Sequence, residues 1–168
     1  MQKYTSKDTC INKVSKIYSH YAFKPYSRVL DYGGGKYETN TEYMKQKNVS
    51  VFVYDKFNRD EEHNQLVLEQ CSFWPVDYVV CSNVLNVIMK DGIINEILLH
   101  IWQLSSKAII LFKIYEGNKT AIGCETSRGY QRNERTSDYI KNFITTYFDI
   151  KSVHDGIVEC TRKEHIID

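Results

Sequence analysis

Proline is scarce in this chain, and no low-complexity tract or glycine-rich linker separates one part of it from another. The 168 residues therefore predict a single domain, 1–168. No apolar run approaches the roughly 18 residues that a membrane-spanning helix needs, and the N-terminal segment lacks the apolar stretch of a secretory signal. We expect a cytoplasmic protein that does not associate with membranes.

Cysteine pairs and an excess of one charge are also lacking. The five cysteines are odd in number and include no CxxC pair, which argues against a disulfide framework and a zinc site. We expect reduced thiols and no metal. The 22 basic and 21 acidic side chains give a net charge of +1, so a nucleic-acid partner is compatible with the sequence but is not indicated by the charge. Nothing in the sequence indicates an oligomeric state.

Apolar periodicity indicates helices and strands in alternation. The expected helices are 6–21, 39–47, 59–70, 91–104 and 137–147. The expected strands are 28–32, 49–54, 76–81, 107–115, 150–153 and 157–160. Asp155 and Gly156 favour a hairpin turn between the last two strands. This order predicts an α/β, Rossmann-like three-layer sandwich, with a mostly parallel sheet and an antiparallel C-terminal strand.

A glycine turn follows the first expected strand, in the segment RVLDYGGGKY at 28–37. A backbone can approach a ligand closely at such a turn, and the amides that open the next helix favour a carboxylate or a phosphate. Asp55 ends the second expected strand, where a carboxylate can accept hydrogen bonds from ribose hydroxyls. Together these features predict an adenosine-like ligand.

Three segments in this order, VLDYGGGKY, VYDKFN and VDYVVCSNVLNVI, resemble the class I S-adenosylmethionine-dependent methyltransferases. The resemblance spans about 28–115 and implies S-adenosyl-L-methionine as the cofactor. It implies that Asp31, Gly33 and Gly35 surround the methionyl part, Asp55 the ribose, and Asn83 the rim beside the sulfonium. The full set of cofactor-binding residues expected on this basis is Asp31, Tyr32, Gly33, Gly34, Gly35, Tyr37, Asp55, Lys56, Ser82 and Asn83.

The chain departs from the family pattern at two places. Tyr37 stands where a third glycine is common, and its bulk can narrow that end of the pocket. The residues between Asp55 and Val76 leave little room for both a helix and a full third strand. The residue that contacts adenine is therefore unassigned, with 69–73 as the preferred segment.

Other interpretations of the glycine turn stay open. A nicotinamide-dinucleotide site needs G-x-G-x-x-G, whereas position 38 is Glu. The turn can also be purely structural and bind nothing. A phosphate-binding P-loop is excluded, because no glycine-lysine-serine or glycine-lysine-threonine triplet occurs.

The polar segment 116–136 is longer than an ordinary connection and predicts either a loop that closes on a substrate or a solvated loop. Its expected substrate-binding residues are Arg128, Tyr130, Gln131 and Arg132. Together with Glu62-His63-Asn64, the segment resembles small methyltransferase-like proteins of bacteriophages and bacteria.

The catalytic candidates are Asn83, His63 and Glu116, although a lone histidine on a polar helix is often exposed and idle. The predicted function is an S-adenosylmethionine-dependent methyltransferase acting on a small molecule, RNA or a protein side chain. The alternative is a protein that binds the cofactor without transfer, either a non-catalytic subunit or a phage-type protein that sequesters or degrades the cofactor.

Overall fold

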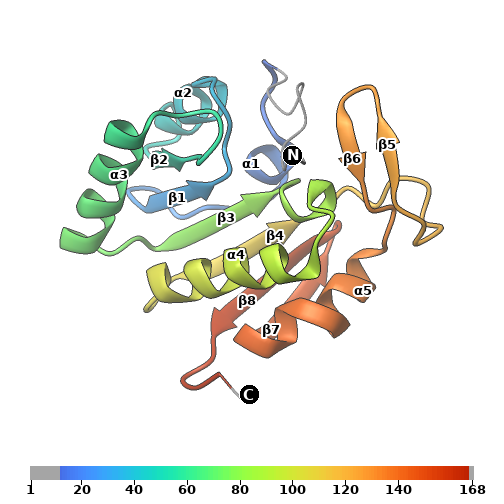
Figure 1. Cartoon of the computed structure of the whole chain (residues 1–168). Helices are drawn as coiled ribbons and strands as arrows, with labels where there is room; N and C mark the ends of the chain where they lie inside the picture. The colour runs from blue at the N-terminus through green and yellow to red at the C-terminus, as the bar shows by residue number, and fades with distance from the viewer. Residues whose placement is uncertain (1–11, 167–168) are drawn as a thin grey trace.

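The protein was analysed as a computed structural model that describes residues 12–166 (Figure 1). In chain order its elements are α1 (Lys16–His20), β1 (Arg28–Tyr32), α2 (Thr39–Lys45), β2 (Ser50–Tyr54), α3 (Glu61–Phe73), β3 (Tyr78–Ser82), η1 (Leu85–Val87), α4 (Asp91–Leu104), β4 (Ile109–Lys113), β5 (Cys124–Thr126), β6 (Gly129–Gln131), α5 (Thr136–Tyr139), η2 (Ile140–Ile144), α6 (Thr145–Tyr147), β7 (Phe148–His154) and β8 (Ile157–Arg162). Of the helix expected over 6–21, residues 6–11 lie outside the described residues, and the described part forms only α1.

Six strands form the central sheet in the order β2-β1-β3-β4-β8-β7. The first four are parallel, whereas β8 pairs antiparallel with both β4 and β7. The predicted α/β Rossmann-like sandwich with antiparallel C-terminal strands is therefore confirmed. The two-residue turn between β7 and β8 has positive φ at Asp155 (52°) and Gly156 (69°), the backbone that the sequence predicted for a hairpin at this point.

Alternate residues of each strand point to opposite faces of the sheet, and both faces are covered. Val29 of β1 packs with buried side chains of α1 and α2. Leu30 packs instead with α3, α4 and the helical segment 136–147. The three layers follow from this alternation, and Figure 1 shows α4 and α5 lying together over one face.

The sheet begins at β2, with no strand beyond it among residues 12–166. A single helix, α3, carries the chain from β2 to β3, so the expected shortage of a third strand after Asp55 is confirmed. His63 on α3 makes a 2.8 Å hydrogen bond between its Nε2 and the carbonyl oxygen of Val53 in this edge strand. A side chain thus satisfies part of an edge that would otherwise be open to another strand.

Two further segments differ from the sequence expectations. The polar stretch 116–136 contains the small hairpin β5–β6. The helix expected over 137–147 begins at Thr136 and contains a π-helical turn, η2, in its middle. None of the helices within residues 12–166 has the length and apolar character that a membrane crossing requires.

Candidate functional site

A large cavity of about 1940 Å³ opens at the carboxyl ends of the parallel strands. This is the edge at which open α/β sheets bind their ligands. The volume exceeds the roughly 300–1,000 Å³ of ordinary small-molecule pockets, so it can hold two reactants at once. The glycine turn after β1, the turns after β2, β3 and β4, and the β5–β6 hairpin all contribute to its wall.

The glycine turn is held in a backbone that favours glycine. Gly33 and Gly35 have φ of +79° and +81°, and the amide of Gly33 donates a 2.7 Å hydrogen bond to the carbonyl oxygen of Tyr54. A Cβ at Gly33 would lie 2.4 Å from Cγ2 of Val84, in the turn after β3. The absence of a side chain at Gly33 therefore lets the turns after β1 and β3 touch.

Replacing Gly33 with alanine is expected to lower the free energy of unfolding by about 2 kcal/mol, because it combines a positive φ with a clash at Val84. Gly92→Ala is the matched control, since a Cβ there meets nothing within 4 Å and alanine favours the helix. Urea unfolding of both variants measures the difference. Equal stability of the two variants would contradict the close approach of the turns.

Asp31 carries the strongest polar anomaly of the cavity. The residue is 2% exposed, and its Oδ2 has no hydrogen-bond partner in the described part of the chain. Burial raises the pKa of Asp31 to about 7, the charge of Asp55 adds to the rise, and Tyr18 and Asn40 oppose it. A buried carboxylate with one oxygen left without a partner, in a ligand-sized cavity, is suited to a cationic group such as an ammonium.

Asp55 is buried as well, but its carboxylate is fully engaged. Oδ2 accepts hydrogen bonds from the Gly35 amide at 2.8 Å and from Nδ2 of Asn58 at 3.1 Å. Oδ1 accepts from the amides of Phe57 at 2.9 Å and Asn58 at 3.0 Å. The side chain of Asn64 holds the backbone of Asp55: its Oδ1 accepts from the Asp55 amide, and its Nδ2 donates to the Asp55 carbonyl. The carboxylate thus joins the glycine turn to the loop after β2.

Most of the residues singled out from the sequence do meet in this cavity. Its wall includes Asp31, Tyr32, Gly33, Gly34, Tyr37, Asp55, Lys56, Ser82, Asn83, Glu116, Arg128, Tyr130 and Gln131. Three of the expected residues, Gly35, His63 and Arg132, are not part of the wall. Gly35 still contributes to the site, because its backbone amide donates a hydrogen bond to the Asp55 carboxylate.

His63, expected to be catalytic, lies outside the cavity wall. Its ring is engaged with the Val53 carbonyl at the edge of the sheet, and its backbone amide donates a 2.7 Å hydrogen bond to Oδ1 of Asp60, the N-cap of α3. The sequence could not show this role, because the strand that His63 touches precedes it by ten residues in the chain.

Glu116 lines the cavity but is poorly suited to act as a base. Its Oε1 accepts a 2.8 Å hydrogen bond from the Thr136 amide, and its Oε2 lies 3.2 Å from Nζ of Lys119. The hydrogen bond from Thr136 and the charge of Lys119 hold the pKa of Glu116 below its usual value, against a smaller effect of burial. A carboxylate with a lowered pKa takes up a proton less readily.

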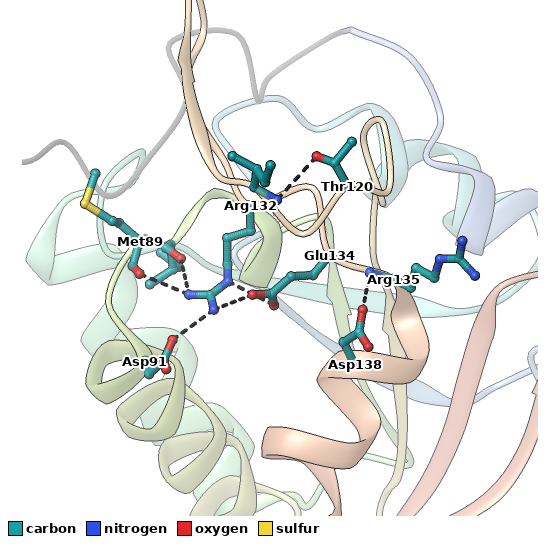
Figure 2. A network of polar contacts seen from close by, with 9 residues as sticks. Met89, Asp91, Thr120, Arg132, Glu134, Arg135 and Asp138 are labelled. Carbon is teal, nitrogen blue, oxygen red and sulfur yellow. Dashed lines mark hydrogen bonds and ion pairs between the residues drawn. The ribbon is translucent and has the colours of Figure 1, made fainter.

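Arg132, expected to bind substrate, lies outside the cavity wall, and its guanidinium is engaged by neighbouring residues (Figure 2). Its side chain is 9% exposed, and its guanidinium binds Glu134 at 2.8 and 3.1 Å and Asp91 at 2.9 Å. It also donates to the carbonyl oxygens of Ile88 (3.2 Å) and Met89 (3.0 Å). Burial alone would lower the pKa of Arg132, but the two carboxylates hold it above its usual value. The guanidinium therefore fastens the segment after β6 to the start of α4.

The segment 116–136 is well connected along its length. The side chain of Asn133 donates a 2.8 Å hydrogen bond to the Ile122 carbonyl and accepts one from the Asn118 amide at 3.2 Å. Nε2 of Gln131 donates to the Tyr115 carbonyl at 3.1 Å. These bonds build an ordered cover over the cavity, with Arg128, Tyr130 and Gln131 in its wall.

Sequence reasoning missed an aromatic group in the cavity wall. Tyr32 and Tyr54 lie with their ring centroids 4.9 Å apart, and His100 of α4 meets both rings edge-on. The Tyr32 hydroxyl and Nδ1 of His100 are 2.8 Å apart. Burial lowers the pKa of His100, and the charge of Lys56 lowers it further, so both effects favour the neutral imidazole. The sequence signal that could have indicated this group is a histidine, His100, within the mostly apolar helix 91–104.

The segment 69–73, preferred for the adenine contact, lies elsewhere. The Gln70 carbonyl accepts a 3.3 Å hydrogen bond from Arg28, at the start of β1, and none of these residues lines the cavity. Phe57 and Asn58 line it instead, in the loop after Asp55. The end of α3 carries the segment 69–73 to the amino ends of the strands, away from the cavity. The residues 12–166 bring together no group of three or more His, Cys, Asp or Glu side chains suited to a metal.

No protein-family model matches the chain, and no curated protein matches its sequence. Solved structures do match. Mitomycin 7-O-methyltransferase MmcR is similar with a TM-score of 0.58 and 13% identity, over 88% of this chain and 52% of its own, so the chain spans about half of that protein. A TehB-like SAM-dependent methyltransferase from Corynebacterium glutamicum has a TM-score of 0.49 and 14% identity, over 84% and 83% of the two chains. The DhpI–SAH complex has a TM-score of 0.43 and 12% identity, over 82% and 78%.

Proposed function

We propose that this chain, which has the fold of S-adenosylmethionine-dependent methyltransferases, binds S-adenosylmethionine and transfers its methyl group to an acceptor. One observation carries the proposal: the buried Asp31 carboxylate, whose Oδ2 has no hydrogen-bond partner among residues 12–166, borders the cavity at the end of β1. The methionyl ammonium of the cofactor would be a positively charged hydrogen-bond donor to this carboxylate. The MmcR likeness supports the same fold.

The chain's own residues divide the binding between them. Asp31 binds the ammonium. Gly33 and Gly34 have no side chain, so their backbone is open to the ligand in the cavity. Ser82, the last residue of β3, and Asn83, which follows it, border the proposed reacting end of the cavity. When bound, the cofactor supplies a methyl group activated on a sulfonium. Tyr37 and Lys56 flank the other end, and Asn83 remains the candidate to orient the acceptor.

The acceptor occupies the part of the cavity under the β5–β6 hairpin. Arg128, Tyr130 and Gln131 are the proposed substrate-binding residues there, and they come from the ordered cover described above. Glu116 is paired and His63 lies outside the cavity, so neither of these two residues is placed to take a proton from the acceptor. Small molecules, RNA and protein side chains remain the acceptor classes to test.

Calorimetry on the purified protein is expected to show S-adenosylmethionine and S-adenosylhomocysteine binding at one site, with dissociation constants of roughly micromolar size. Adenosine alone should bind more weakly, because it does not engage Asp31. Absence of heat with either cofactor form would overturn the proposal. Transfer is then assayed with methyl-labelled cofactor against each class of acceptor.

A cofactor-binding protein without methyl transfer is the second candidate. It is favoured by the same two observations, the paired Glu116 and the remote His63, because neither residue expected to act as a base is free to do so in the cavity. Cofactor turnover without any acceptor would indicate degradation. Binding without turnover across all acceptor classes would indicate a subunit or a sequestering protein.

A further inference from the structure

The hydrogen bonds of Asp55 raise a question about sugar recognition. An ionised carboxylate has about four acceptor positions. All four are taken by donors of the protein: the amides of Gly35, Phe57 and Asn58, and the Asn58 side chain. Two ribose hydroxyls can reach this carboxylate only if existing donors leave it.

The backbone donors are costly to displace. The Gly35 bond joins the glycine turn to the end of β2 across twenty residues of chain, and it is buried. A buried amide that loses its partner costs about 1–3 kcal/mol. The loop itself is fastened by Arg59, whose Nε donates to the Gly35 carbonyl at 2.8 Å and whose amide donates to the Asp55 carbonyl at 3.1 Å. Asp55 therefore keeps its backbone partners.

Asn58 is placed to do what Asp55 cannot. The residue is half-buried and lines the cavity. Its Nδ2 is held by Asp55, which fixes the orientation of the amide group. Its Oδ1 accepts no hydrogen bond from any residue between 12 and 166, and it can accept one from a hydroxyl donor.

We propose that Asn58, rather than Asp55, recognises the sugar hydroxyls of the nucleoside, and that Asp55 is a positioning residue that holds Asn58 and Gly35. This inference rests on the proposed function, because it assigns a role at the same cofactor site. It places ribose recognition three residues beyond the acidic residue that ends β2. Discrimination for the hydroxyls then depends on an amide, whereas Asp55 affects the whole binding turn.

Calorimetric titrations with S-adenosylhomocysteine and with its 2′,3′-dideoxy analogue test this assignment. The wild-type protein is expected to prefer the natural sugar by about tenfold, the equivalent of one hydrogen bond with its geometry fixed in advance. Asn58→Ala is expected to remove this preference by weakening only the binding of S-adenosylhomocysteine. Asp55→Asn should weaken both ligands and lower the preference only in part, because it loosens the turn and the hold on Asn58 but leaves the Asn58 amide in place.

Gln65→Ala is the matched control, an amide lost from the exposed face of α3, and it should leave both affinities unchanged. Thermal unfolding verifies that each variant is folded. The assignment is overturned if Asn58→Ala keeps the tenfold preference, or if Asp55→Asn is the variant that abolishes it. If the wild-type protein binds neither ligand, the proposed function itself fails. If the wild-type protein binds both ligands and Asn58→Ala keeps the wild-type preference for the natural sugar, only the role of Asn58 is rejected.

Discussion

Asp31→Asn is expected to give a protein that is more stable above pH 7 and binds S-adenosylhomocysteine more weakly. The carboxyl is 2% exposed and lacks a partner at Oδ2, so ionising it within the fold is unfavourable. A pKa of about 7 in place of 3.8 corresponds to about 4 kcal/mol once the group is ionised in both the folded and the unfolded chain. An amide of the same shape removes that cost. It also removes the negative charge, and with it about ten- to a hundredfold in affinity for an ammonium ligand.

The pH dependence of Asp31→Asn gives the sharper test. Because the folded state holds its proton more tightly, the wild-type protein loses stability as the pH rises from about 4 to about 7, and no further above that. Urea unfolding at pH 4 should therefore show little difference between the two proteins, and at pH 8 the variant should be more stable by up to about 4 kcal/mol. Asp149→Asn, at an exposed carboxyl of β7, should change stability by about 0.5 kcal/mol or less at either pH. A difference between wild type and variant that does not vary with pH would contradict the raised pKa.

Arg132→Met is expected to lower the free energy of unfolding by about 3 kcal/mol. The change leaves Glu134 and two backbone carbonyls without their donor, and it removes a guanidinium that also lies over the ring of Phe143, 5.6 Å from its centroid. Removing one partner of a buried charged network costs more than the network contributes when intact. Methionine retains most of the side-chain volume, so the loss measured in urea reports the polar contacts (Figure 2).

Arg128→Met controls for the loss of an arginine on the same hairpin. Its side chain is exposed, and its replacement should change stability by about 0.5 kcal/mol or less. Equal effects of the two substitutions would show that Arg132 does not anchor the segment. Substitution at Arg128, unlike Arg132, is expected to act on acceptor binding, since Arg128 lies in the cavity wall.

Much of the fold was readable because its signals are local. The strand Arg28–Tyr32 and the helix Asp91–Leu104 have the bounds that their apolar patterns predict. The β5–β6 hairpin was missed because Cys124–Thr126 is exposed throughout and has no alternation of apolar and polar residues. The π-helical turn at Ile140–Ile144 leaves no mark in periodicity either. It depends on packing against the rest of the protein.

The site was predicted where its residues are consecutive and missed where it depends on distant contacts. Asp31 and the glycine turn adjoin one another in the sequence, and both border the cavity. That Arg132 points to Asp91, and His63 to Val53, follows from how helices and strands pack, which spacing does not reveal. The single-domain organisation, the cytoplasmic location and the acceptor stay predictions.

The position of β8 has a consequence for how the protein is made. The last strand along the chain lies in the interior of the sheet, with Ile109 of β4 paired to Thr161. The ribosome synthesises β4 well before β8. During synthesis, the strand position beside β4 and its apolar residues Leu111 and Phe112 is therefore unfilled. Completion of the sheet must follow emergence of β8. A nascent or truncated chain that stops short of Ile157 therefore exposes a hydrophobic strand edge, the kind of surface that chaperones bind.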